Sequence, residues 1–238
     1  MKKNTVSLLL AASALVFMAG CAGGAKNSAA QKDETVNESQ AQTDAVDAVD
    51  SEAAGTEEAG LKSQEAFSWL PADVVREKSE TEPNEELRKL IAEYYEIPDD
   101  ELADSRYYYN YVDLDSDGTN EIFAVVVGSY TSGSGGSSAL WCEEQDGALA
   151  VKQAFTQVNL PVIVVDNEEG GPKDLILERS GGGAEIEYVK LSCTDGVYTN
   201  VSDAEAVSGL ESVQGVAVLC NDLADDMQTG NYLTLEGV

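Results

Sequence analysis

The chain has 238 residues, of which 14 are Lys or Arg and 44 are Asp or Glu, so its formal net charge is −30. It contains no His, which excludes catalytic triads and zinc sites that depend on imidazole. The charge also argues against nucleic acid as a partner and against a polybasic membrane patch, because both depend on clustered Lys and Arg.

Residues 1–20 have the pattern of a signal peptide: two early lysines, an apolar run over 6–18, and small residues before Cys21. The segment Met18-Ala19-Gly20-Cys21 resembles the lipobox of bacterial lipoproteins. The resemblance implies that Cys21 is lipidated and becomes the mature N-terminus. Two or more acyl chains, such as palmitate, anchor a protein stably, so we expect the chain at the extracytoplasmic face of a bacterial cell membrane. The alternative is an ordinary secretory signal with a chance cysteine.

The segment 21–60 follows as an acidic, low-complexity stretch without an aromatic residue. It cannot bury enough apolar surface to offset the entropy of ordering, so a disordered tether is predicted. Residues 61–82 contain an apolar island around Trp69. This island predicts an N-terminal arm that packs on the next domain, and the alternative is an exposed anchor for a partner.

The folded domain is predicted to span residues 83–238 and to begin with a helix. Asn84 can cap this helix, and Pro98 ends it. Apolar side chains recur at the spacing of one helical face, at Leu87, Leu90, Ile91, Tyr94 and Tyr95.

Strands are predicted next, from runs of aromatic and β-branched residues. The run 122–127 is apolar throughout, as in a strand that is covered on both faces. Asp146-Gly147 and Asp195-Gly196 predict hairpin turns. The predicted strands are 107–112, 122–127, 139–142, 149–155, 162–165, 175–177, 186–191 and 197–200.

The strand region contains an internal repeat, over about residues 107–155 and 162–200. Residues 112–122 align with 165–175 at an offset of 53, which preserves three acidic positions and one glycine. A Gly/Ser-rich loop, a cysteine and an Asp-Gly turn follow in each copy. We expect each copy to be an antiparallel meander, and the two copies to stack or pair into one sheet.

A C-terminal helix is predicted from the spacing of Val216, Leu219, Leu223 and Met227, with Gly230 at its end. The predicted fold class is therefore α+β and mainly antiparallel β, with two meander repeats forming a sheet flanked by an N-terminal and a C-terminal helix.

An acidic loop in the first repeat carries the candidate chemistry. Asp113, Asp115 and Asp117 project carboxylates into one small space, and Gly118 permits a sharp bend. Hard oxygen ligands at alternate positions suit Ca²⁺. The alternative is an Asp/Gly turn that never holds a metal.

The loop is not an EF-hand, because Ala124 stands where the last glutamate ligand belongs and a strand follows instead of a helix. Glu121 is the best remaining ligand, and the Thr119 carbonyl is a further candidate.

The segment from Asp113 to Glu121, followed by a strand, resembles the calcium loops of FG-GAP and related β-propeller blades. The wider stretch 107–137 resembles a group of uncharacterised surface lipoproteins of Gram-positive bacteria, and the likeness covers roughly residues 84–235. It implies a Ca²⁺ site at Asp113, Asp115, Asp117 and Glu121, and nothing about catalysis. Two repeats cannot close a propeller. The second copy has Gly170 in place of Asp117 and so lacks one ligand.

Three cysteines remain after Cys21: Cys142, Cys193 and Cys220. Cys142 and Cys193 are equivalent in the repeat, so a disulfide could join their strands. The alternative is that the thiols are free and buried.

Two classes of function fit these observations. The first is a non-catalytic binding or interaction module that recognises a cell-wall component or a protein, with Ca²⁺ stabilising the first repeat. The second is an extracellular hydrolase that uses carboxylates or a metal. The first is favoured because no nucleophile and base stand out, so no catalytic residue is predicted.

Overall fold

The computed structural model describes residues 67–237. The predicted signal peptide, Cys21, the tether and the first residues of the arm lie outside this range. Among the described residues, no helix is long and apolar enough to cross a membrane.

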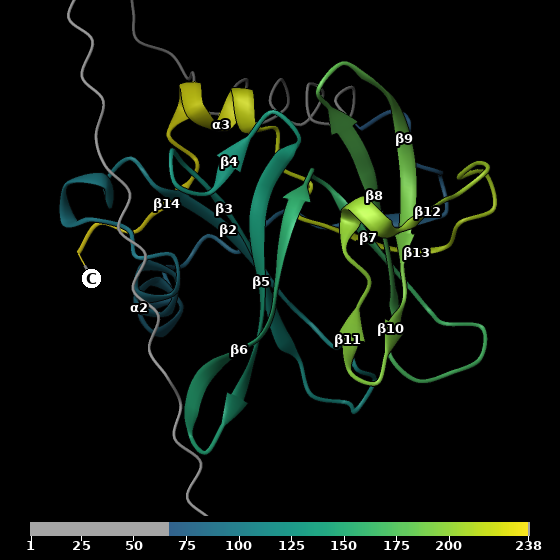
Figure 1. The fold of residues 1–238 in the computed structure, drawn as a ribbon, viewed down its shortest axis with the longest axis horizontal. Coiled ribbons are helices and arrows are strands. Elements are labelled where there is room, and N and C mark those ends of the chain that lie inside the picture. Colours follow the sequence, from purple (N-terminus) through teal and green to yellow (C-terminus); the bar gives the residue numbers. More distant parts are fainter. Residues whose placement is uncertain (1–66, 238) are drawn as a thin grey trace, which may run out of the picture. The chain divides into compact units, whose positions relative to one another are not determined.

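Two six-stranded sheets make up most of the structure (Figure 1). The first-repeat sheet has the order β14-β2-β3-β5-β4, with β6 also paired to β5. Its strands are β14 (Leu233–Thr234), β2 (Arg106–Val112), β3 (Glu121–Val127), β5 (Gly136–Gln145), β4 (Ser132–Gly133) and β6 (Ala148–Val158).

The second-repeat sheet has the order β1-β13-β7-β8-β9-β12. Its pairings are antiparallel except for that of β1 with β13. Its strands are β1 (Val74–Arg76), β13 (Gly215–Val218), β7 (Val162–Val165), β8 (Asp174–Gly181), β9 (Ala184–Leu191) and β12 (Glu205–Ala206). A separate hairpin joins β10 (Cys193–Thr194) to β11 (Val197–Tyr198).

Helix α2 (Glu85–Tyr94) begins where the sequence predicts, because the Asn84 side chain accepts a hydrogen bond from the N–H of Leu87 (3.0 Å). Leu87 and Ile91 are fully buried against the outer face of the first-repeat sheet. The other helical elements within residues 67–237 are α3 (Leu223–Thr229) and two 3₁₀ turns, η1 (Asp99–Glu101) and η2 (Val201–Asp203). The predicted α+β class with mainly antiparallel strands is confirmed.

The two repeats have the same register. Val112 pairs with Glu121 in the first copy, and Val165 pairs with Asp174 in the second, which preserves the offset of 53 residues. Both predicted hairpin turns form: Asp146-Gly147 brings Gln145 opposite Ala148, and Asp195-Gly196 brings Thr194 opposite Val197.

The copies lie in two stacked sheets and not in one continuous sheet, which differs from the expected arrangement. The reason is that the central strands carry apolar side chains on both faces, so each sheet must be covered on both sides. In the first copy Phe123 faces the core between the sheets and Ala124 faces outward. In the second copy Leu175 faces that core and Ile176 faces outward. The core between the sheets is built on large buried side chains, among them Tyr108, Phe123, Trp141, Phe155, Leu175, Leu177 and Leu191.

The C-terminal helix is shorter than its spacing predicts. Residues 216–218, expected in the helix, instead form β13, which pairs with β7 on one side and β1 on the other. Asp222 then caps α3 by accepting hydrogen bonds from the N–H groups of Ala224 and Asp225. Gly230 ends the helix in the left-handed conformation, as expected (φ 78°). Pairing with two distant strands therefore overrides the helical spacing of the apolar residues.

The arm packs on the outer face of the second-repeat sheet. Phe67, Leu70 and Val74 are buried there, and the ring of Trp69 packs at a tilt of 31° against that of Tyr188, with centroids 4.8 Å apart. The three cysteines in the described part of the chain are free, and Cys142 and Cys220 are buried.

Candidate metal centre

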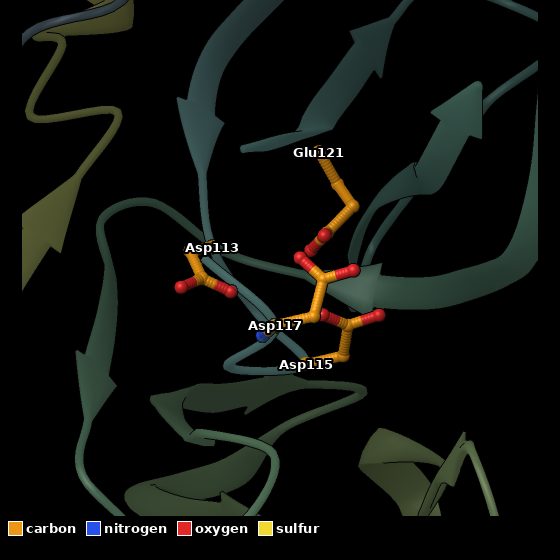
Figure 2. A group of neighbouring side chains, drawn as sticks. All are labelled: Asp113, Asp115, Asp117 and Glu121. Carbon is orange, nitrogen blue, oxygen red and sulfur yellow. Dashed lines mark hydrogen bonds between the residues drawn. The ribbon is translucent and has the colours of Figure 1, made fainter. Parts of the chain in front are cut away.

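The acidic loop connects β2 to β3, and the pairing of Val112 with Glu121 closes it. Ser116 (φ 64°) and Gly118 (φ 91°) both adopt the left-handed region, which reverses the chain within a few residues. Gly118 was predicted to permit this bend. Figure 2 shows the side chains of Asp115, Asp117 and Glu121 pointing toward one another, with Asp113 beside them.

Backbone amides of the loop hold three of the four carboxylates in place. The N–H of Gly118 donates to Asp113 Oδ2 (3.1 Å), that of Asp117 to Asp115 Oδ1 (3.2 Å), and that of Thr119 to Asp117 Oδ1 (2.7 Å). These bonds orient the acidic side chains before any ion arrives. Thr119 is in the loop as expected, and its carbonyl as a ligand stays a prediction.

Glu121 approaches from the first residue of β3 and is only 5% exposed. Its Oε2 accepts hydrogen bonds from the N–H of Leu114 (2.8 Å) and from the indole N–H of the buried Trp141 (3.4 Å). Burial raises the pKa of Glu121, against the effect of these donors.

One oxygen from each of Asp113, Asp115, Asp117 and Glu121 lies within 4.8 Å of the others, so the cluster can hold a metal ion. Two carboxylates at that separation repel each other by about 1 kcal/mol even at the dielectric constant of water. Asp113 Oδ1 is buried without a hydrogen-bond partner, an arrangement that costs free energy unless a donor or cation completes it. The residues therefore fit a cation with oxygen ligands.

Lys152 on β6 already faces this cluster. Its ammonium lies 2.9 Å from Asp115 Oδ2 and 2.5 Å from Glu143 Oε2, and 4.3 Å from the centroid of the Trp141 ring. Burial is the largest single effect on Asp115 and acts to raise its pKa, but the hydrogen bond and charge of Lys152 together with the N–H of Asp117 give a net lowered pKa. One ammonium cannot neutralise the whole group of acids, so the cluster stays negative.

The equivalent loop of the second repeat is neutralised differently. Lys173 contacts Asp166, and the ammonium of Lys190 lies 3.4 Å from Asp174, the counterpart of Glu121. Gly170 leaves the position of Asp117 without a side chain. Each of the two acids at the ends of the second loop, Asp166 and Asp174, therefore has its own lysine partner.

The two loops touch through the carbonyl of Leu114. This oxygen accepts a hydrogen bond from the N–H of Lys173 (2.7 Å). The hydroxyl of Tyr198 donates its single hydrogen to the carbonyl of Lys173 (2.8 Å) and lies 3.5 Å from the carbonyl oxygen of Leu114. The first loop is therefore tied to the second repeat.

Sequence reasoning brought together the four acidic residues but missed Lys152, Glu143 and Trp141. The Asp146-Gly147 turn was a usable signal, because a hairpin at that turn brings the chain around 143 beside the chain around 150–152.

No protein-family model, curated protein or solved structure matches this chain.

Proposed function

We propose that this protein is a lipoprotein anchored through Cys21 at the extracytoplasmic face of a bacterial membrane, and that residues 67–237 form a non-catalytic binding module stabilised by Ca²⁺. The observation that carries the ion assignment is the cluster of four carboxylates with one oxygen each within 4.8 Å of the others. The buried Oδ1 of Asp113, which has no hydrogen-bond partner within residues 67–237, adds to it.

Calcium suits this site better than magnesium for two reasons. Ca²⁺ takes roughly six to eight oxygen ligands in flexible geometry, whereas Mg²⁺ requires a near-ideal octahedron. The loop offers carboxylates from a short turn and from a strand, with burial that ranges from exposed to buried, which is an irregular donor set. Asp117 and Glu121 each keep one oxygen that forms no hydrogen bond within residues 67–237.

Two features support a binding role over a catalytic one: the expected membrane anchor and the burial of the thiols. The anchor holds the module outside the cell, where a cell-wall component or a protein is accessible. The free thiols of Cys142 and Cys220 are buried, and burial raises the pKa of Cys142 to about 12, so they serve packing and not nucleophilic attack.

The test is calorimetric titration of Ca²⁺ into the metal-stripped full chain. We expect one site with a dissociation constant of roughly 0.1–1 mM, the range of extracellular modules. The variant Asp115→Asn/Asp117→Asn is expected to lose this site. The matched control, Asp166→Asn/Glu168→Gln, removes two charges from the second loop, at the counterparts of Asp113 and Asp115, and is expected to keep the site.

If the heat of Ca²⁺ binding is unchanged in the Asp115→Asn/Asp117→Asn variant, the ion binds to other acids of the chain and the proposed site is refuted. No binding to the wild-type protein at several millimolar Ca²⁺ would make the loop a structural turn.

A further inference from the structure

A polar cavity of about 370 Å³ lies where the arm, α3 and β14 meet. Its lining includes Lys78, Asn221, Asp226, Asn231 and Tyr232, and none of the residues of the acidic loop. Cavities of a few hundred Å³ with a small number of convergent polar groups are typical of small-molecule sites.

A buried carboxylate belongs to this cavity. Asp226 is 4% exposed, and its Oδ2 accepts a hydrogen bond from the side-chain amide of Asn221 (3.0 Å), which is itself 6% exposed. Within residues 67–237, Oδ1 of Asp226 forms no hydrogen bond, and the side chain has no Lys or Arg partner within 4.0 Å. A buried charge without a cationic partner is costly, and the cost falls when a cation binds.

The cavity wall is held by hydrogen bonds that need no ligand. Asn221 Oδ1 accepts the N–H of Ser79 in the arm (2.9 Å). The backbone carbonyl of Asp226 accepts the N–H groups of Gly230 (2.8 Å) and Asn231 (3.2 Å) at the end of α3. The carboxylate is therefore positioned in advance, which reduces the entropy lost on binding.

The charges around Asp226 are of both signs. Asp222 and Asp225 add negative potential, and Lys78 from the arm adds positive potential. Glu80 also lines the cavity, and the Arg106 guanidinium lies over the ring of Tyr232, 4.8 Å from its centroid. Asp226 is the buried member of this set and has no ion-pair partner within 4.0 Å in the described part of the chain, so a cation is the ligand that completes it.

We propose that this cavity binds a small organic cation, whose ammonium group pairs with the carboxylate of Asp226 and whose body lies along Asn231 and Tyr232. This inference rests on the proposed binding function, for which it names a ligand class, and it is independent of the calcium site. Burial raises the pKa of Asp226, so the carboxylate is most available for pairing at neutral pH and above.

The probe for the test is putrescine, a four-carbon diamine, titrated calorimetrically into the full chain. Its neutral counterpart, 1,4-butanediol, has the same length and replaces each ammonium with a hydroxyl. We expect saturable binding of putrescine and none of the diol. Asp226→Asn keeps the shape and the bond to Asn221 and is expected to weaken putrescine binding by about tenfold or more, the scale of a charge-assisted hydrogen bond in a buried site. Asp225→Asn removes the same charge one residue earlier and is expected to change affinity by less than about twofold.

A second variant keeps the test decisive if Asp226→Asn does not fold. Asn231→Trp places a large side chain at an exposed position of the lining and is expected to block binding while the carboxylate stays intact. Equal losses in Asp226→Asn and Asp225→Asn, or no loss in either, would overturn the proposal, because binding would then reflect the general negative charge.

The two proposals fail separately. The variant Asp115→Asn/Asp117→Asn is expected to bind putrescine normally. Calcium binding without putrescine binding would refute the cavity alone, and putrescine binding without calcium binding would refute the ion site alone.

Discussion

Removal of the Lys152 ammonium is expected to tighten Ca²⁺ binding. In the structure this ammonium pairs with Asp115 at 2.9 Å, and the two side chains are 22% and 24% exposed. Unit charges at that distance attract by about 1.4 kcal/mol at the dielectric constant of water, and a metal ion that takes Asp115 must replace this attraction. Because 1.4 kcal/mol is about a factor of ten in an equilibrium constant, Lys152→Met is expected to bind Ca²⁺ about tenfold more tightly than the wild type.

The assay is calorimetry on wild type, Lys152→Met and the matched control Lys190→Met. The control removes the ammonium that lies 3.4 Å from Asp174 in the second loop, so it changes the net charge equally. Its Ca²⁺ affinity is expected to rise by less than about threefold, through long-range charge alone. An affinity of Lys152→Met equal to or weaker than that of the wild type would show that the lysine does not compete with the ion, and the reasoning would be wrong.

Two further predictions concern pH and the anchor. Hydrogen bonding to Lys152 lowers the pKa of Glu143. For Asp115, burial raises the pKa, but the hydrogen bond and charge of Lys152 and the N–H of Asp117 together lower it. The stability from these pairs is therefore present above the ordinary carboxyl range and is lost as pH falls through the lowered values. Urea unfolding below about pH 4.5 is therefore expected to show a steeper loss of stability in the wild type than in Lys152→Met. Replacement of the cysteine in Cys21→Ser is expected to move the protein from the membrane fraction to the soluble fraction of fractionated cells, because a protein without acyl chains has no stable anchor. Retention of that variant on the membrane would contradict lipid attachment at this residue.

Local sequence patterns predicted most of the individual elements. The strand 162–165 was predicted with the bounds that the structure has, and Asn84 caps α2 as expected. These features depend on neighbours in the chain: the period of the apolar residues, the cap and the Asp-Gly turns. The repeat alignment went further, because two copies of one pattern fold into two hairpins with one register.

What the sequence left unpredicted depends on distant partners. Val216 and Val218 have the spacing of a helix, and only the neighbouring strands β7 and β1 show that they form a sheet. The assignment of Lys152 to the acidic cluster requires the pairing of β5 with β6 and the irregular register between Trp141 and Cys142. Composition alone gives no sign of the cavity at Asp226, because that cavity is assembled from the arm, α3 and β14.

The hydrogen bond to the carbonyl of Leu114 extends the effect of calcium binding from the loop to the whole module. This oxygen belongs to the acidic loop, but its donor, the amide of Lys173, belongs to the second repeat, and the hydroxyl of Tyr198 holds the carbonyl of the same lysine. A cation that stiffens the loop would also fix the distance between the two repeats. Proteolytic sites in either repeat would then be protected together, at one calcium concentration, and the amides of both sheets would exchange more slowly as a single unit.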